Sequence, residues 1–238
     1  ENIMALPKLN TTPSHEMVQP STGEKILYRP YLVKEEKILL LAFEGGDQKQ
    51  AMRAMIDVVA ICCDDVKAKS LTVFDVEYMF TQIRSRSVGE TAAINIKCEN
   101  EECDHATECK VNLQEIEVEL PDVSPMIELT PSVSLELKYP AFHDFLNNFD
   151  EKMSETEFGF KMIGKCIKTI MTEDERIDAN DVSQKEMQEF IDSMTNAQFE
   201  KIGGFMQSAP TMKHDVDFKC PSCGTEQSKT LKGIQDFF

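Results

Sequence analysis

Two pairs of cysteines, far apart in the sequence, restrict the fold of this chain more than any other feature. The pairs are Cys98-x4-Cys103 and Cys220-Pro-Ser-Cys223-Gly. Alternating apolar and polar residues surround each pair, which predicts that each lies at the turn of a β-hairpin. Two hairpin turns that face each other supply the tetrahedral four-sulfur shell that structural zinc prefers. We therefore predict one structural Zn²⁺ bound by these four cysteines.

The separation of the pairs does not prevent them from sharing a metal. Closing the intervening loop of roughly 116 residues costs about 4 kcal/mol, because the cost grows only with the logarithm of loop length. Zinc in a four-ligand site supplies about 10–16 kcal/mol, with the folding of the site included. A metal can therefore tie the two hairpins together, and the segment between them is expected to belong to the same domain.

The sequence leaves other interpretations of the cysteines open. The two hairpins can carry buried thiols without a metal, since buried free cysteines are common. Cys109 is a rival ligand, although its alternation with Val111 predicts that it points into the core. His105 or His214 can also replace one sulfur. The other cysteines lie in apolar stretches without the positive charge that lowers a thiol pKa, so core packing is expected for Cys62, Cys63 and Cys166.

Apolar residues at spacings of three and four predict helices in two parts of the chain. In the first part, from Lys34 to Gly89, Asp47 and Thr72 are placed to cap two helices. The second part is predicted to be helical from Pro140 to Pro210. It contains three capping boxes. In each, the side chain of the first residue accepts the backbone N–H of the residue three positions later, and the side chain of that later residue accepts the backbone N–H of the first. These are Ser154 with Glu157, Ser183 with Glu186, and Thr195 with Gln198.

Together these elements predict an α+β fold, with hairpins joined by zinc and a helical block between the two cysteine turns. We expect residues 1–15 to form a flexible N-terminal arm and residues 16–238 to form a single α+β domain. The helical block is placed at about residues 140–209, and the zinc ribbon is formed by residues 94–120 and 211–234. Met4-Ala5-Leu6-Pro7 is typical of a natural start, so the origin of residues 1–3 is left open.

The charge of the chain favours protein partners over nucleic acid. The formal net charge is −17, whereas binding to DNA or RNA depends on Lys and Arg that displace counterions. Acidic residues also match or outnumber the lysines around both cysteine pairs. No apolar run approaches the ~18 residues of a membrane-spanning helix, and the N-terminal region has no secretion signal. We therefore expect reduced thiols and no membrane partner.

No catalytic motif is found, and the chain is predicted not to be an enzyme. It has no His-Glu-x-x-His, no phosphate-binding glycine loop and no Gly-x-Ser-x-Gly elbow. A catalytic zinc keeps an open position for water, which a closed four-cysteine shell does not offer. A metal-dependent hydrolase is therefore the least favoured class. An intracellular zinc-ribbon regulator that binds host proteins or nucleic acid is the main alternative to a structural role.

Several motifs, in a fixed order, resemble the T4-type bacteriophage baseplate hub (hub assembly) protein family. Besides the Cys220/Cys223 turn, they are Gln19-Pro-Ser-Thr-Gly23, Tyr28-Arg-Pro-Tyr-Leu-Val-Lys-Glu-Glu-Lys37, Arg84-Ser-Arg-Ser-Val-Gly-Glu90, Phe190-Ile-Asp-Ser-Met194 and Gly233-Ile-Gln-Asp-Phe-Phe238. The resemblance implies a structural or assembly component of a contractile phage tail, with other baseplate hub or wedge proteins as partners. It also implies assembly in the host cytoplasm, and leaves open whether the protein stays in the virion.

Five residues are candidates for contacts with partners. Phe237 and Phe238 are two consecutive aromatic residues that either fill the core of the chain itself or dock into a neighbour. Arg29, Arg84 and Arg86 are rare positive charges on an acidic chain, so they are the other candidates.

Overall fold

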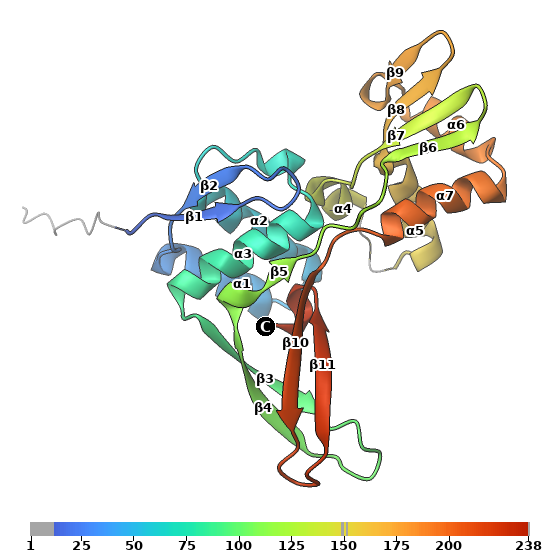
Figure 1. The fold of residues 1–238 in the computed structure, drawn as a ribbon. Coiled ribbons are helices and arrows are strands. Elements are labelled where there is room, and N and C mark those ends of the chain that lie inside the picture. Colours follow the sequence, from blue (N-terminus) through green and yellow to red (C-terminus); the bar gives the residue numbers. More distant parts are fainter. Residues whose placement is uncertain (1–11, 149, 151, 238) are drawn as a thin grey trace, which may run out of the picture.

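The computed structural model describes residues 12–148, 150 and 152–237, and it confirms a mixed α+β fold (Figure 1). The first eleven residues of the expected arm lie outside this part, and strand β1 begins at the arm's last residue, His15. The helices are α1 (Val33–Glu44), α2 (Gln48–Cys62), α3 (Val73–Ser87), α4 (Phe142–Asn148), α5 (Glu155–Cys166), α6 (Gln184–Asp192) and α7 (Asn196–Gln207). The strands are β1 (His15–Val18), β2 (Lys25–Tyr28), β3 (Thr91–Lys97), β4 (Ala106–Asn112), β5 (Glu117–Val118), β6 (Met126–Thr130), β7 (Val133–Leu137), β8 (Ile167–Thr172), β9 (Arg176–Asp178), β10 (Met212–Lys219) and β11 (Glu226–Lys232).

The N-terminal part packs the β1–β2 hairpin and helices α1–α3 around one apolar core. Both predicted caps are confirmed, since Asp47 accepts the N–H of Gln50 and Thr72 accepts the N–H of Asp75. The fully buried Asp75 carboxylate also accepts hydrogen bonds from Thr72 N (3.0 Å), Ser21 N (2.9 Å) and Gln19 Nε2 (3.2 Å). The Gln19–Gly23 motif therefore fastens the first hairpin to the start of α3.

Two long antiparallel hairpins, β3–β4 and β10–β11, project from this helical part with their turns at the same end (Figure 1). Strand β5 pairs with β10, so a segment that follows the first hairpin becomes the edge of the second hairpin's sheet. A second core lies between the hairpins and includes Val111, Leu113, Met212 and Phe237. The hairpins predicted on either side of the cysteine pairs are confirmed.

The remaining part packs helices α5–α7 against a four-stranded antiparallel sheet with the order β6-β7-β8-β9. All three predicted capping boxes are present. The expectation that the block from Pro140 to Pro210 contains only helices was wrong, because α5 ends at Cys166 and the chain continues directly into strand β8. The segment Ile167-Lys-Thr-Ile-Met-Thr172 is rich in β-branched residues, which fit a pleated sheet, and it pairs with both β7 and β9.

Tyr139 joins this last part to the N-terminal core. Its ring lies edge-on to Phe74 at 5.6 Å between centroids and stacks on Phe205 at 4.6 Å. The bridge between Thr72 and Ala141 aligns the backbone beside it. The single domain expected for residues 16–238 stays a prediction. The contacts of Tyr139, and that of Phe145 on α4 with Phe158 on α5 at 5.1 Å between ring centroids, are aromatic contacts on which its continuity would rest.

We expect Glu77→Gln to stabilise the protein at neutral pH. Burial raises the pKa of the Glu77 carboxyl, although the N–H of Ile234 donates a hydrogen bond to it and lowers the pKa in part. The folded protein therefore holds this proton more tightly than the unfolded chain does, so stability falls as pH rises from the unfolded pKa through the folded one. A glutamine can accept the same hydrogen bond without burying a charge.

The measurement is the melting temperature of both proteins across the acidic to neutral range. The advantage of the variant should be largest above the folded pKa of Glu77 and should disappear below the unfolded pKa of about 4.3. An advantage that does not change with pH would contradict this explanation.

Candidate metal centre

The turns of the two projecting hairpins bring four cysteine side chains into one cluster. The Sγ atoms of Cys98, Cys103, Cys220 and Cys223 all lie within 4.8 Å of one another. Cys98 Sγ is 3.7 Å from Cys223 Sγ, and Cys103 Sγ is 3.8 Å from Cys220 Sγ, so each short contact crosses from one hairpin to the other. Three of the four cysteines are buried, and Cys223 is exposed.

Backbone hydrogen bonds in each turn aim the paired thiols at the other hairpin. In the first turn, Cys98 N donates to His105 O at 2.9 Å and Cys103 N donates to Asn100 O at 2.8 Å. In the second, Cys220 N donates to Thr225 O at 2.9 Å, and Gly224 N donates to Cys220 O at 2.8 Å. Gly224 has a φ of +76°, a left-handed conformation that glycine adopts without strain.

The spacing of the sulfur atoms fits a tetrahedral zinc shell and not a disulfide. Zn–S bonds of about 2.3 Å place the corners of a tetrahedron about 3.8 Å apart, which agrees with the two shortest contacts of 3.7 and 3.8 Å. A disulfide needs about 2.05 Å between sulfur atoms. The described residues thus form a donor set with the composition and size of a structural zinc site, while zinc ligation itself stays a prediction.

The pKa values of the clustered thiols are pulled in opposite directions. Hydrogen bonds with Thr225 lower the pKa of Cys223 to about 6. At Cys103 a backbone hydrogen bond at His105 acts to lower the pKa, but burial and the neighbouring thiols outweigh it and raise the pKa to about 11. Hydrogen bonding thus favours the thiolate at Cys223, whereas burial favours the neutral thiol at Cys103.

The sequence analysis did not identify two polar residues that form hydrogen bonds with the clustered cysteines. Gln227 Nε2 donates to Cys98 Sγ at 2.8 Å, while its Oε1 accepts the N–H of Glu99 at 2.9 Å, so this amide joins the two hairpins. Thr225 Oγ1 lies 3.2 Å from Cys223 Sγ. Metal-bound thiolates need such outer hydrogen bonds. A search for amide and hydroxyl groups just after Cys223 would have found both residues.

The rival ligands lie outside the cluster. Cys109 is buried in the core between the hairpins, as its alternation predicted. Neither His105 nor His214 belongs to the group of described residues that could hold a metal. The expected core packing of Cys62, Cys63 and Cys166 is confirmed, because all three are buried among the apolar side chains of the two helical parts. Burial also raises the pKa of Cys62 to about 11 and those of Cys63 and Cys166 to about 12.

The structure places Phe237 in the first of the two roles left open for it, and Phe238 lies outside the described residues. Phe237 is 1% exposed and fills the core between the hairpins. Two of the three arginines form ion pairs within the chain, and the role of all three in partner contacts stays a prediction. Arg29 bonds Glu35 at 3.1 Å, and Arg86 bonds Glu90 at 2.8 Å. Arg84 is partly buried, and this burial lowers the pKa of its guanidinium.

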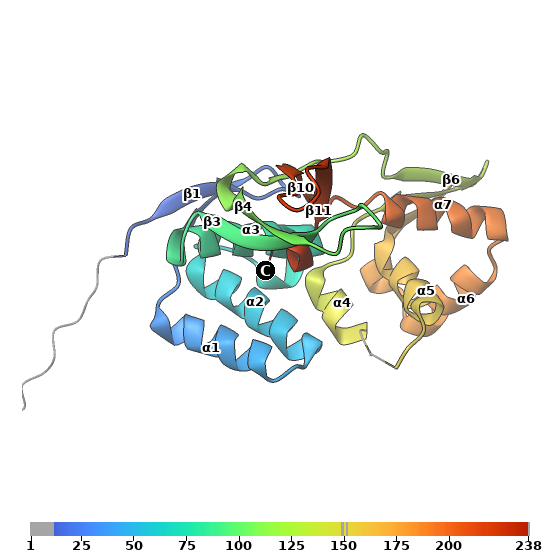
Figure 2. The ribbon, with the colours of Figure 1, turned by 90° about the horizontal axis from the view of Figure 1, so that it is seen from below.

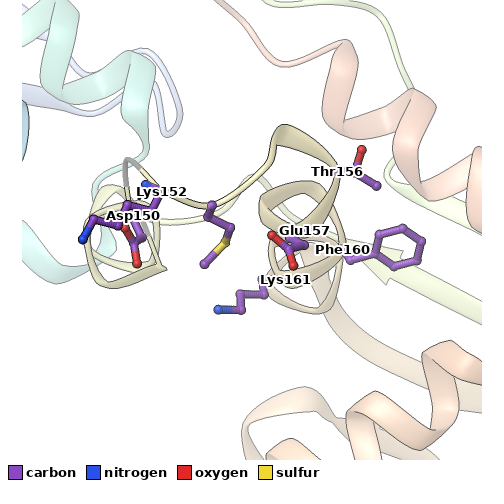
Figure 3. Close-up of a pocket in the computed structure, with 7 residues that line it drawn as sticks. Asp150, Lys152, Thr156, Glu157, Phe160 and Lys161 are labelled. Atoms are coloured by element: carbon purple, nitrogen blue, oxygen red, sulfur yellow. Dashed lines mark hydrogen bonds between the residues drawn. The ribbon is translucent and has the colours of Figure 1, made fainter.

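A separate surface cavity of about 580 Å³ lies at the start of α5, and Figure 3 shows its lining. Glu157 and Lys161 point to one side of the helix, while Thr156 and Phe160 point to the other (Figure 3). The side chains therefore do not converge on one point. Glu157 already closes the capping box with Ser154. These residues offer no nucleophile paired with a base, so the cavity gives no support to catalysis.

The comparisons with known proteins confirm the resemblance to the baseplate protein family. A family model described as T4 bacteriophage base plate protein matches residues 12–238. The chain is 24% identical over 218 residues to the baseplate hub assembly protein gp26 of Enterobacteria phage T4, which covers 91% of this chain and 94% of that protein. No solved structure matches the chain. In the part that the structure describes, no helix combines the length and the apolar character needed to cross a membrane.

Proposed function

Because the chain belongs to the T4 bacteriophage base plate protein family, we propose that it is a structural or assembly component of a contractile-tail phage baseplate hub. It acts through contacts with other hub or wedge proteins while the tail is built in the host cytoplasm. The observation that carries this proposal is the near full-length similarity to a baseplate hub assembly protein.

The proposal includes a structural Zn²⁺ bound by Cys98, Cys103, Cys220 and Cys223. The spacing of the sulfur atoms, the burial of three thiols and the hydrogen bond from Gln227 support it. The metal would supply the positive charge that neutralises four crowded thiolates, and it would fix the turns of the two hairpins to each other. The two joined hairpins would then form a rigid surface, which neighbouring proteins can bind without the entropy cost of ordering it first.

The charges around the hairpin turns favour a protein partner over nucleic acid. Lys97, Lys219 and Lys229 each lie within 4.0 Å of an acidic side chain, namely Asp104, Glu226 and Glu99. These lysines are partly neutralised where phosphate contacts would need them. The zinc-ribbon regulator that binds nucleic acid is therefore the weaker alternative.

Native mass spectrometry of the purified protein, alone and mixed with candidate hub and wedge proteins, tests both parts of the proposal. We expect one zinc per chain and a stable complex with at least one baseplate protein. A metal-free protein that still forms the complex would contradict the zinc site and support the assembly role. A zinc-loaded protein that binds no baseplate protein would support the zinc site and contradict the assembly role. Mass spectrometry of purified virions then shows whether the protein stays in the tail.

We expect Gln227→Leu to weaken zinc binding by about 10- to 100-fold, the usual effect of losing an outer hydrogen bond at a metal site. The reason is that leucine can neither donate a hydrogen bond to Cys98 Sγ nor accept one from the N–H of Glu99. Competition with a chromogenic chelator measures the affinity. Thr230→Val on the same strand is the matched control, because it loses only a hydrogen bond to Asp215. Equal affinities for the two variants would contradict a role for Gln227 at the metal.

A further inference from the structure

Helix α1 carries apolar side chains on the face that it turns to solvent. Val33 is 79% exposed, and Leu40 and Leu41 are 55% and 59% exposed. Ile38 and Phe43 flank them and are about half exposed. The helix lies at the outer edge of the helical part, beyond α2 (Figure 2). Contiguous exposed apolar side chains of this kind are typical of interaction sites.

Two charged residues on this face occupy regular positions along the helix and form no ion pair with another described residue. Val33, Lys37, Leu40 and Glu44 follow one another at spacings of four, three and four, so they lie on one line along the helix. Lys37 and Glu44 are exposed, and neither takes part in an ion pair with another described residue. We define the α1 face as these four residues and Leu41.

We propose that the α1 face binds the α1 face of a second copy of this chain, with the two helices antiparallel about a two-fold axis. In this arrangement Leu40 and Leu41 lie on either side of the axis. Lys37 is then level with Glu44 of the partner subunit, and Glu44 is level with Lys37 of the partner subunit. The symmetry thus produces two opposite-charge pairs around an apolar centre.

The pattern of charges favours a second copy over an unrelated partner. A two-fold interface must be complementary to itself, and one lysine and one glutamate seven residues apart, centred on two leucines, satisfy this condition. The groove between α1 and α2, about 350 Å³ in volume and lined in part by Ile38, Leu41 and Ala42, adds apolar surface beside the axis. The local charges are balanced even though each whole chain has a net charge of −17.

The test uses the full chain in sedimentation equilibrium from about 1 µM to about 100 µM, at about 0.15 M salt, where the repulsion between acidic chains is largely screened. We expect a monomer–dimer equilibrium. Lys37→Glu and Glu44→Lys should each raise the dimer Kd by about tenfold or more, because each variant faces itself with two like-charge pairs. A mixture of the two variants should form a heterodimer, and the double variant should dimerise as the original chain does.

Control substitutions separate the face from general effects. Lys185→Glu on α6 reverses a similarly exposed charge, and Val88→Asp removes an apolar side chain that is 59% exposed elsewhere. Both should leave the dimer Kd unchanged. A monomer at every concentration would overturn the proposal, as would a dimer that the charge reversals do not affect. If Leu40→Asp instead abolishes the capture of a baseplate protein by a monomeric chain, the face belongs to that partner and the proposal is wrong.

Discussion

Replacing Cys220 with serine is expected to abolish zinc binding and to lower the melting temperature by about 8–16 °C. A ligand present at a thousand times its Kd stabilises the folded state by about 4 kcal/mol, and each kcal/mol shifts the melting temperature of a chain of this size by about 2–4 °C. Cys220 is fully buried within the cluster, so the serine cannot swing out of the site. Zinc content and melting temperature, each with and without a chelator, are the measurements.

Cys109→Ala is the matched control for this substitution. Cys109 is a buried cysteine in the adjacent core, so its loss should destabilise the chain through packing while zinc content stays at one per chain. The decisive reading is chelator sensitivity. A chelator should lower the melting temperature of the original protein and of the Cys109 variant, but not that of the Cys220 variant. An original protein that is metal-free and indifferent to the chelator would end the zinc hypothesis.

The second large effect is expected from Asp75→Ala, which should lower the free energy of unfolding by about 3 kcal/mol or more. Removing the carboxylate takes an acceptor from three N–H groups, two of them in buried hydrogen bonds (Thr72 and Gln19) and one in a partly buried bond (Ser21). A hydrogen bond to a charged group contributes about 1.5–3 kcal/mol. The donors come from the β1–β2 hairpin and from the first turn of α3, so both elements lose their attachment. Chemical denaturation with two independent probes measures the change.

Asp47→Ala provides the comparison, because Asp47 also accepts a backbone N–H at a helix start but is only partly buried. Water can take over the exposed N–H there, so the cost should be about 1 kcal/mol. Similar losses for the two variants would show that Asp75 is only a helix cap and that the contact with the first hairpin adds little.

The parts of the fold that could be predicted depend on short stretches of sequence. A capping box needs only residues at either end of one helical turn, which is why Ser183 with Glu186 and Thr195 with Gln198 were identified. The cysteine turns could be predicted for the same reason, since each pair lies between strands of alternating pattern. Their meeting in space was inferred from the preference of zinc for four sulfur ligands, which is a chemical rule that does not depend on distance along the chain.

The parts that could not be predicted depend on contacts between distant segments. Ile167 lies four residues after Ile163 and extends a helical stripe, yet it begins a strand because β7 offers it a hydrogen-bonding edge. Nothing local indicates that edge. Gln227 is similarly one glutamine among many until the turn at Cys98 is placed opposite it. Choosing between the two roles of Phe237, filling the core or docking into a neighbour, required the core between the two hairpins to be known first.

The distance between the cysteine turns has a consequence during protein synthesis. Cys103 and Cys220 are 117 positions apart, and ribosomes add about 5–20 residues per second, so the first turn leaves the ribosome roughly 6–23 seconds before the second. During that interval Cys98 and Cys103 are exposed to the cell as an incomplete pair, open to oxidation or to the wrong cation. The meeting of the two cysteine turns is thus a late event. It can occur only in chains translated past Cys223, and not in chains that stopped before it.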